Sequence, residues 1–550
     1  MQNMKKYLKT TFAGFAAAAL FVGCIEEVEP TDRALEDDVT VETLLDGIPA
    51  ALVKVNSTGY GAQGAAWDFA FPATRVAMES MTGDLVVTGN IGYDWFSQWG
   101  TNDALGPEYA VGVIFWNNYY QWIMTVNDVI RKINEMNPAQ LTAAEKSYMG
   151  IAHAYRAMFY LDLVRLYEFR ENAYTDGSAV LGLGVPVVLP ETTDAEARNN
   201  PRAKVDDIYD KVIFPDLEMA ANLLSGFTPA DKYTVSLPFV YGLQARAWLE
   251  RGTAGNDRDA YASAAEFARK AITASGCTPL TQEQWEDPVN GFNNANSNNA
   301  WIWGLAIPEE SVSNLLGFTA SMSTEQEWSG YGYSVGRGIN KNLYHSINSR
   351  DFRKHSWLDP DLSSYAYKSC RPDADVWFSK TLASYANIKF RPRGGKYQDP
   401  IGGGAADFPM MRVEEMYFIE AEAAAQAQGD PRTGVSLLND FMNSYRMTDG
   451  GVYDCSARVS TMESFLNELM LQKRIEFWGE GIVMFDMKRL NFSTKRGYVG
   501  TNAPSSYRLN TEGRAPYWNF TIPRGEIQNN TALSGKNNPD PSASVPVWQG

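Results

Sequence analysis

Histidine and cysteine are scarce in this sequence, and basic residues are fewer than acidic ones. It has three histidines and four cysteines in 550 residues, and 65 acidic against 48 basic residues give a formal net charge of −17. None of the histidines or cysteines falls in an H-E-x-x-H or C-x-x-C motif, and no P-loop or strand-borne dinucleotide fingerprint is present. A negative surface repels nucleic acid and anionic lipid headgroups. We therefore expect no metal, no cofactor and no nucleic-acid partner.

Long apolar runs are also absent, apart from one short stretch near the N-terminus. Three lysines in the first nine residues precede apolar residues 11–22, which have the length of a signal-peptide core and are too short to span a bilayer. The stretch ends in LFVGC, which resembles the box where a bacterial lipoprotein signal peptidase cleaves before an acylated cysteine. We predict a signal peptide over residues 1–23 and lipidation of Cys24, the alternative being cleavage as a soluble protein.

An acidic segment follows Cys24. Residues 24–38 contain several acids and no aromatic residue, which is typical of a flexible tether. A similar acidic run in one group of Gram-negative bacteria directs lipoproteins to the outer face of the outer membrane. A solvated tether without a sorting role would have the same acidic composition. Removal of residues 1–23, with three lysines and no acid, brings the formal charge to −20.

Apolar residues recur at helical spacing over much of the remaining chain. No comparable series of alternating strands is visible, so the class is predicted to be mainly α. The predicted helices cover residues 111–136, 142–167, 205–224, 238–251, 257–274, 412–428, 432–446 and 462–478.

A weak internal repeat occurs within these helices. A tyrosine followed four and six residues later by alanines appears three times, at Tyr148, Tyr241 and Tyr417. Small residues on one helical face let a partner helix approach closely, as in tetratricopeptide-type hairpins that stack to bury a shared core. The repeat therefore predicts a scaffold of helical hairpins.

Two regions lack this periodicity. Residues 275–404 are rich in Asn, Gly, Ser, Tyr and Trp, and residues 56–108 form a second irregular stretch that includes Trp95 and Trp99. Long irregular loops in a compact protein are usually binding surfaces. We expect the helices to form the scaffold and these two regions to form the ligand-binding surface.

The segment EWSGYGYSVGRG at residues 327–338 allows two interpretations. It contains the G-x-S-x-G pattern of a hydrolase around Ser334, with Asp351 and His355 following in the right chain order. The preceding TEQEWSGY, however, lacks the buried strand that a nucleophile elbow requires, so a surface serine hydrolase is only a remote alternative. The other interpretation is a loop that offers aromatic faces to a ligand.

A pyranose has an apolar face that aromatic rings bury and a rim of hydroxyls that polar side chains satisfy. The candidate ligand-binding residues are Trp328, Tyr331 and Tyr333, with Trp95 and Trp99 as a second wall.

Five further segments are distinctive in their order along the chain. They are AEKSYMGIAHAYRAMFYLDLVRLY (144–167), PRAKVDDIYDKVIFPDLEMAANLL (201–224), MRVEEMYFIEAEAAAQAQGD (411–430), QKRIEFWGEGIVMFDMKRLN (472–491) and FTIPRGEIQNN (520–530). The third contains an Arg-x-x-Glu-Met-Tyr signature beginning at Arg412, and the fourth contains a Glu-Gly motif at Glu480. In this order the segments resemble the SusD/RagB-like outer-membrane lipoproteins. After the Glu-Gly motif this chain has Val483 where that family usually has Arg, which puts a local ion pair in doubt.

The resemblance implies a SusD-like domain over residues 39–550, built from tetratricopeptide-like hairpins with a loop-rich lobe at about 275–404. It implies no catalytic activity and a lipid-anchored protein of the outer membrane that faces the cell exterior and binds oligosaccharide. It also implies a partner, a SusC-like TonB-dependent β-barrel transporter. Some relatives carry oligopeptides, so an oligopeptide-binding lid is the alternative.

Overall fold

The computed structural model describes residues 40–55, 67–89, 91–312, 316–326, 331–361, 363 and 384–550. The predicted signal peptide, Cys24, the acidic tether and Trp328 lie outside these residues. The described chain is mainly α, as predicted, with two small antiparallel sheets. No helix in these ranges is both long enough and apolar enough to cross a membrane.

All eight predicted helical segments are helical, with ends shifted by about a turn or less. The longer helices are α2 (Val41–Val53), α3 (Ala70–Ser80), α5 (Ala110–Asn134), α6 (Ala143–Tyr167), α9 (Phe214–Leu223), α10 (Leu237–Gly255), α11 (Arg258–Ser275), α17 (Val413–Gln428), α18 (Pro431–Tyr445) and α19 (Met462–Glu476). The short helices are α4 (Ser97–Thr101), α7 (Asp194–Ala197), α8 (Val205–Ile208), α12 (Gln282–Glu286), α13 (Phe318–Met322), α14 (Tyr331–Val335), α15 (Lys341–Ser346), α20 (Val483–Arg489) and α21 (Arg524–Asn529).

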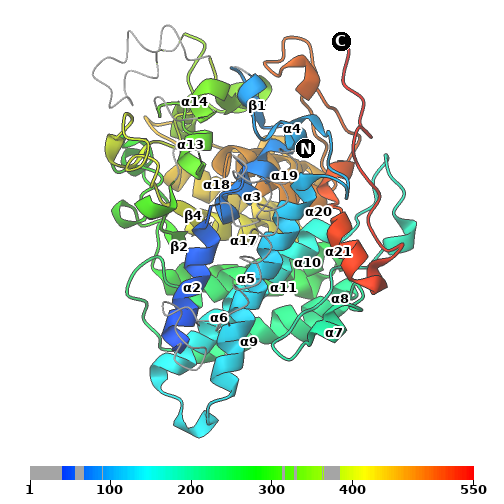
Figure 1. Cartoon of the computed structure of the whole chain (residues 1–550). Coiled ribbons are helices and arrows are strands. Elements are labelled where there is room, and N and C mark those ends of the chain that lie inside the picture. The colour runs from blue at the N-terminus through cyan, green and yellow to red at the C-terminus, as the bar shows by residue number, and fades with distance from the viewer. Residues whose placement is uncertain are drawn as a thin grey trace, which may run out of the picture.

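The long helices pack as hairpins. Helix α5 lies beside α6, α10 beside α11, and α17 beside both α11 and α18 (Figure 1). The alanines of the repeat are buried, including Ala245 and Ala247 on α10. At Gly252 a Cβ would lie 2.7 Å from the ring of Tyr261 on α11, so glycine is what allows these two helices to approach so closely. The predicted hairpin scaffold is therefore confirmed.

Helix α6 shows how the ends are fixed. At its start, the Thr142 hydroxyl accepts a hydrogen bond from the Glu145 N–H, and the Glu145 carboxylate accepts one from the Thr142 N–H. This capping box satisfies donors that a helix start would otherwise leave free. At its end, the buried Lys488 ammonium donates to three carbonyls, those of Arg165, Leu166 and Glu168.

Two strand pairs tie the loop-rich residues to the helices. Strand β1 (Leu85–Val87) pairs antiparallel with β3 (Arg337–Ile339), with Leu85 opposite Ile339. Strand β2 (Trp301–Leu305) pairs antiparallel with β4 (Phe408–Arg412), with irregularities around Trp303. The first pair joins residues before position 100 to the middle of the chain, and the second joins that middle part to α17.

Helix α3 was not predicted from the sequence, because residues 56–108 lack helical periodicity. All eleven of its residues are buried, so its polar side chains face other parts of the protein rather than solvent. Its Arg75 is nevertheless paired, donating to Asp162 on α6 at 2.6 Å. A helix enclosed on every side has no solvent-exposed stripe, and its buried polar residues interrupt the apolar spacing from which helices are predicted.

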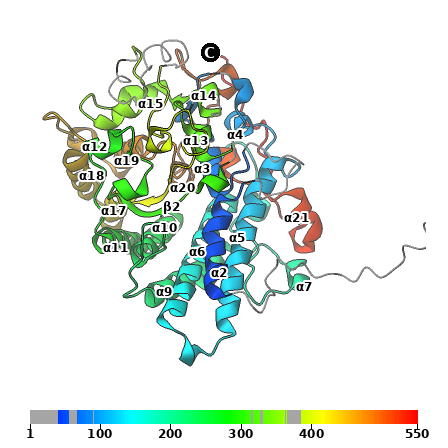
Figure 2. The same ribbon diagram turned by 60° about the vertical axis from the view of Figure 1, so that its left-hand side comes forward.

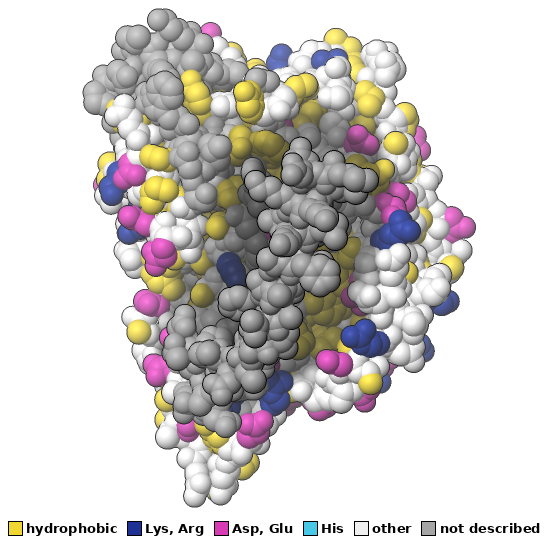
Figure 3. Space-filling view, in the orientation of Figure 1, with side chains coloured by type: hydrophobic (Ala, Val, Ile, Leu, Met, Phe, Trp, Pro, Cys, Tyr) yellow, Lys and Arg dark blue, Asp and Glu magenta, His cyan; other side chains and the backbone are white. Residues whose placement is uncertain are grey.

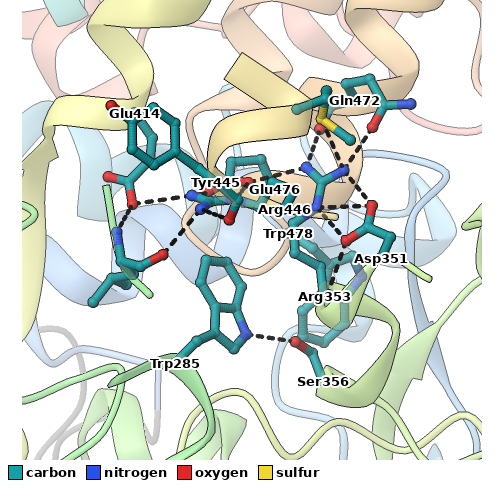
Figure 4. A network of polar contacts seen from close by, with 12 residues as sticks. Trp285, Asp351, Arg353, Ser356, Glu414, Tyr445, Arg446, Gln472, Glu476 and Trp478 are labelled. Carbon is teal, nitrogen blue, oxygen red and sulfur yellow. Dashed lines mark hydrogen bonds and ion pairs between the residues drawn. The ribbon is translucent and has the colours of Figure 1, made fainter. Parts of the chain in front are cut away.

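A cluster of buried charges holds four distant segments together, and Figure 4 shows its members Glu476, Arg353 and Arg446. The Glu476 carboxylate at the end of α19 accepts hydrogen bonds from Arg446 at 2.8 Å, Arg353 at 3.0 Å and Arg412 at 3.1 Å. All four side chains are at most 1% exposed. Burial raises the pKa of Glu476, but the three guanidinium groups outweigh burial and hold that pKa well below its ordinary value.

The neighbouring Glu480 explains why Val483 is tolerated. Its carboxylate accepts hydrogen bonds from Arg412 at 2.9 Å and from Lys389 at 2.8 Å. Val483 is itself buried on α20. The carboxylate thus has two cationic partners without an arginine at position 483, and the fold is kept.

We expect Glu476→Gln to lower stability by about 3–5 kcal/mol, because three buried guanidinium groups would lose their shared anionic partner. Chemical denaturation followed by circular dichroism measures this loss. Glu463→Gln, at an exposed position of the same helix, should change stability by less than about 0.5 kcal/mol. Equal effects of the two substitutions would contradict the role given to the cluster.

A second prediction concerns Glu79, buried on α3. Burial, with the Asp84 charge nearby, raises its pKa from 4.5 to about 8, against the opposing effects of the Gly479 and Gly481 N–H groups and of Lys389. Between pH 4.5 and 8 the folded protein holds a proton that the unfolded chain releases, so stability falls as pH rises. Glu79→Gln should make the decline between pH 5 and pH 8 shallower in denaturation curves. Parallel curves for the wild type and the variant would refute this assignment.

Candidate functional site

An exposed aromatic surface lies at the end of the molecule where α14, α4 and β1 meet (Figures 1 and 2). Trp95 is 45% exposed and Tyr93 is 53% exposed. The rings of Trp95 and Tyr331 meet edge to face, with centroids 5.7 Å apart. The turn that carries Tyr93 packs against α14. We call Tyr93, Trp95 and Tyr331 the aromatic platform.

Backbone pairing brings the two halves of the platform together. Beyond the end of β1, the Thr88 N–H donates to the Gly336 carbonyl at 2.9 Å and the Gly89 N–H donates to the Val335 carbonyl. Gly336 has a φ of 62°, a left-handed conformation that favours glycine. At Gly89 a Cβ would lie 2.8 Å from backbone oxygens of α14. The ladder therefore continues past the strands and places α14 against residues 91–95.

The structure separates the predicted site residues. The exposed Trp95 contacts Tyr331, and Tyr331 and Tyr333 are both half-buried on α14. Trp99 is only 2% exposed and packs against Phe96 at 5.4 Å. The prediction that Trp99 contacts ligand needs correction, because its ring belongs to the core. Trp328 lies outside the described residues.

Tyr93 belongs to the platform but was not among the predicted ligand-binding residues. It lies in the same irregular aromatic stretch as Trp95, and its position two residues before that tryptophan was the available signal. Exposed hydrophobic side chains also gather at the end of the molecule that α14 and β1 occupy (Figure 3).

The platform presents neutral groups. Burial raises the pKa of the Tyr331 hydroxyl, and a hydrogen bond with Trp95 opposes that effect. Tyr331 is therefore an uncharged phenol at neutral pH. On the face seen in Figure 3, acidic and basic side chains are interspersed. Within the described ranges, no group of three or more His, Cys, Asp or Glu residues could hold a metal ion.

The arrangement around Ser334 differs from that of a serine hydrolase. Ser334 lies on α14, which precedes strand β3, whereas a nucleophile elbow has the strand first and the helix second. The Asp351 carboxylate binds Arg353 at 2.6 Å, and His355 is hydrogen-bonded to Glu286 at 2.7 Å. Neither candidate partner is directed to Ser334, so the G-x-S-x-G match has no catalytic setting.

A groove of about 970 Å³ lies on other elements, between α2, α5, α7 and α21. Its rings are Trp116, Trp122 and Tyr120, of which both tryptophans are buried. Tyr120 is half-buried and donates its hydroxyl to the Pro186 carbonyl. Because the groove offers little exposed aromatic surface, the aromatic platform is the better candidate for stacking on a ligand.

The overall architecture matches solved structures. A SusD-like carbohydrate binding protein from Bacteroides vulgatus ATCC 8482 is 21% identical, with a TM-score of 0.68 over 91% of this chain and 98% of that chain. A SusD superfamily protein from Bacteroides thetaiotaomicron VPI-5482 is 18% identical, with a TM-score of 0.63 over 91% and 99%. Surface glycan-binding protein A from Bacteroides thetaiotaomicron, in complex with laminarihexaose, is 16% identical, with a TM-score of 0.62 over 90% and 98%.

Two family models match the sequence in succession, whereas no curated protein matches it. Residues 27–249 match a SusD-like model described as starch-binding and associating with the outer membrane. Residues 367–540 match the model of the SusD family. Together these matches cover both the N-terminal helices and the C-terminal motifs around Glu476 and Glu480. The chain belongs to the SusD/RagB-like family.

Proposed function

We propose that this protein is a cell-surface nutrient-binding lipoprotein that captures oligosaccharide on the aromatic platform and delivers it to a SusC-like TonB-dependent transporter. The observation that carries the proposal is the surface contact between Trp95 and Tyr331. Two rings from segments far apart in the sequence are held together at the surface, and Trp95 remains 45% exposed.

The chemistry of the platform suits a neutral sugar. The C–H face of a pyranose can pack on an exposed aromatic ring such as Trp95, while its hydroxyls stay hydrated or bind polar neighbours. The family model is named for starch binding, and one structural neighbour is in complex with laminarihexaose. Both support a glucan-like ligand for this chain.

Binding without catalysis is the function of this family, and the chain is not an enzyme. The proposed membrane anchor consists of acyl chains on Cys24, exposed by removal of the signal peptide at residues 1–23. An acidic tether up to residue 38 connects it to the folded domain. A tethered binding protein raises the local concentration of ligand at the mouth of its transporter. Modest intrinsic affinity is therefore sufficient for uptake.

Replacing Trp95 with alanine should weaken glycan binding about ten-fold, because one aromatic contact contributes roughly 1.5 kcal/mol. Isothermal titration of the protein lacking residues 1–24 against neutral glycans, acidic glycans and mixed peptides measures the effect. Tyr120→Ala, in the groove, should leave the affinity unchanged. Heat from peptides alone would favour the oligopeptide alternative, and loss of binding only in Tyr120→Ala would move the site to the groove.

Cys24→Ser should release the protein from the membrane fraction, because its acyl chains form the proposed anchor. Fractionation of cells and metabolic labelling with a fatty-acid analogue measure this outcome. Cys277→Ser serves as the control, since Cys277 lies within the folded domain and its thiol donates a hydrogen bond to the Trp301 carbonyl. A Cys24→Ser protein that remains labelled and membrane-bound would rule out lipidation at this residue.

A further inference from the structure

A buried polar unit lies directly beneath the aromatic platform. We propose that Asp94, Arg337 and Tyr507 act together as positioning residues that fix the spacing and orientation of Trp95 and Tyr331 before ligand arrives. The inference rests on the proposed function, because it assigns these residues to the proposed ligand site. None of them needs to touch the ligand.

Asp94 is the centre of the unit. Its side chain is 1% exposed and its Oδ1 accepts a hydrogen bond from the Arg337 guanidinium at 2.7 Å. The same Oδ1 accepts from the Phe96 N–H at 3.1 Å, and Oδ2 accepts from the Tyr507 hydroxyl at 2.5 Å. Trp95 lies between Asp94 and Phe96 in the chain. The carboxylate thus constrains the backbone on both sides of the platform tryptophan.

Arg337 anchors the other half of the platform. It begins β3, two residues after the end of α14, the helix that carries Tyr331. Its side chain is 1% exposed and its Nε donates to the Ser321 carbonyl at 2.8 Å. Its guanidinium also lies 5.4 Å from the centre of the Phe96 ring. One side chain therefore links α13, β3 and the loop of Trp95.

Tyr507 supports both rings from a segment 413 residues away from Asp94. Its ring packs so closely against α4 that a Cβ at Gly100 would lie 2.4 Å from it. The same ring forms a small apolar cluster with Val87 and Val335, against which Tyr331 packs. Burial and the Asp94 charge raise the pKa of the Tyr507 hydroxyl, so the hydroxyl remains a donor at neutral pH.

The three residues give the platform a fixed geometry in the absence of ligand. A carboxylate buried with one cationic and two neutral donors is costly to disturb, because each lost donor leaves a buried charge undersatisfied. Rings held in place by such a unit lose little conformational freedom on binding, which favours affinity. Removing the Tyr507 hydroxyl alone should loosen the platform while the Tyr507 ring continues to fill its site.

The test compares two tyrosine hydroxyls in similar surroundings. Tyr119 on α5 donates to Asp162 at 2.8 Å, and Asp162 is paired with Arg75, so Tyr119→Phe removes the same kind of buried bond within the scaffold. Both Tyr507→Phe and Tyr119→Phe should lower the melting temperature. We expect only Tyr507→Phe to weaken the glycan affinity measured by titration, by about three- to ten-fold.

A double substitution separates positioning from general destabilisation. In a Trp95→Ala background, Tyr507→Phe should weaken affinity much less than in the wild type, because its effect acts partly through Trp95. Full additivity of the two substitutions would overturn the proposal. Unchanged affinity in the Tyr507→Phe single variant would overturn it as well, while leaving the proposed function intact.

A measurement without ligand keeps the inference testable by itself. In protein labelled with 5-fluorotryptophan, the Trp95 ¹⁹F resonance is identified by its loss in Trp95→Ala. Tyr507→Phe should shift or broaden that resonance, and Tyr119→Phe should not. If the wild type binds no glycan, the proposed function fails and the ¹⁹F comparison alone decides the positioning role. A Trp95 resonance identical in the wild type and Tyr507→Phe would refute it.

Discussion

The carboxylate of Glu476 and its three arginine partners are the interaction on which the rest of the fold depends. A carboxylate and guanidinium groups taken out of water are stable only when paired. Here Glu476 at the end of α19 meets arginines from the end of α18, the end of β4 and the 3-10 helix Phe352–Ser356. Leaving out any one of these segments would remove a charged partner from the others and weaken the balance of buried charges. The charge cluster therefore makes the loop-rich middle of the chain part of the scaffold.

This constraint explains why loops can carry the site. The hairpins supply buried apolar surface, but they do not by themselves determine where residues 275–404 lie. Arg353 and Lys389, within that region, are tied to α19 and to the turn after it. The pairing of β1 with β3 then fixes α14 relative to the loop of Trp95. A few directional hydrogen bonds and ion pairs thus fix the position of the aromatic platform relative to the helical scaffold.

Several of the predicted helices have one buried and one exposed face, such as α11 and α18. Helix α3 was missed: it is buried throughout, and its polar residues interrupt the apolar spacing. At the site, composition marked the right stretches but could not separate Trp95 from Trp99. The two tryptophans lie four residues apart, yet one packs on Phe96 in the core and the other remains outside. That difference depends on tertiary contacts made by residues far along the chain.

A polar unit beneath an apolar binding surface has a physical rationale. Apolar contacts are non-directional, so rings resting only on Val87 and Val335 could slide or tilt at little cost. The bonds of Asp94 have defined directions and link three distant segments. The apolar cluster supplies support, whereas the carboxylate specifies one arrangement. A ligand surface built from loops needs both, because shape complementarity to a sugar ring is lost when the rings move by about an ångström.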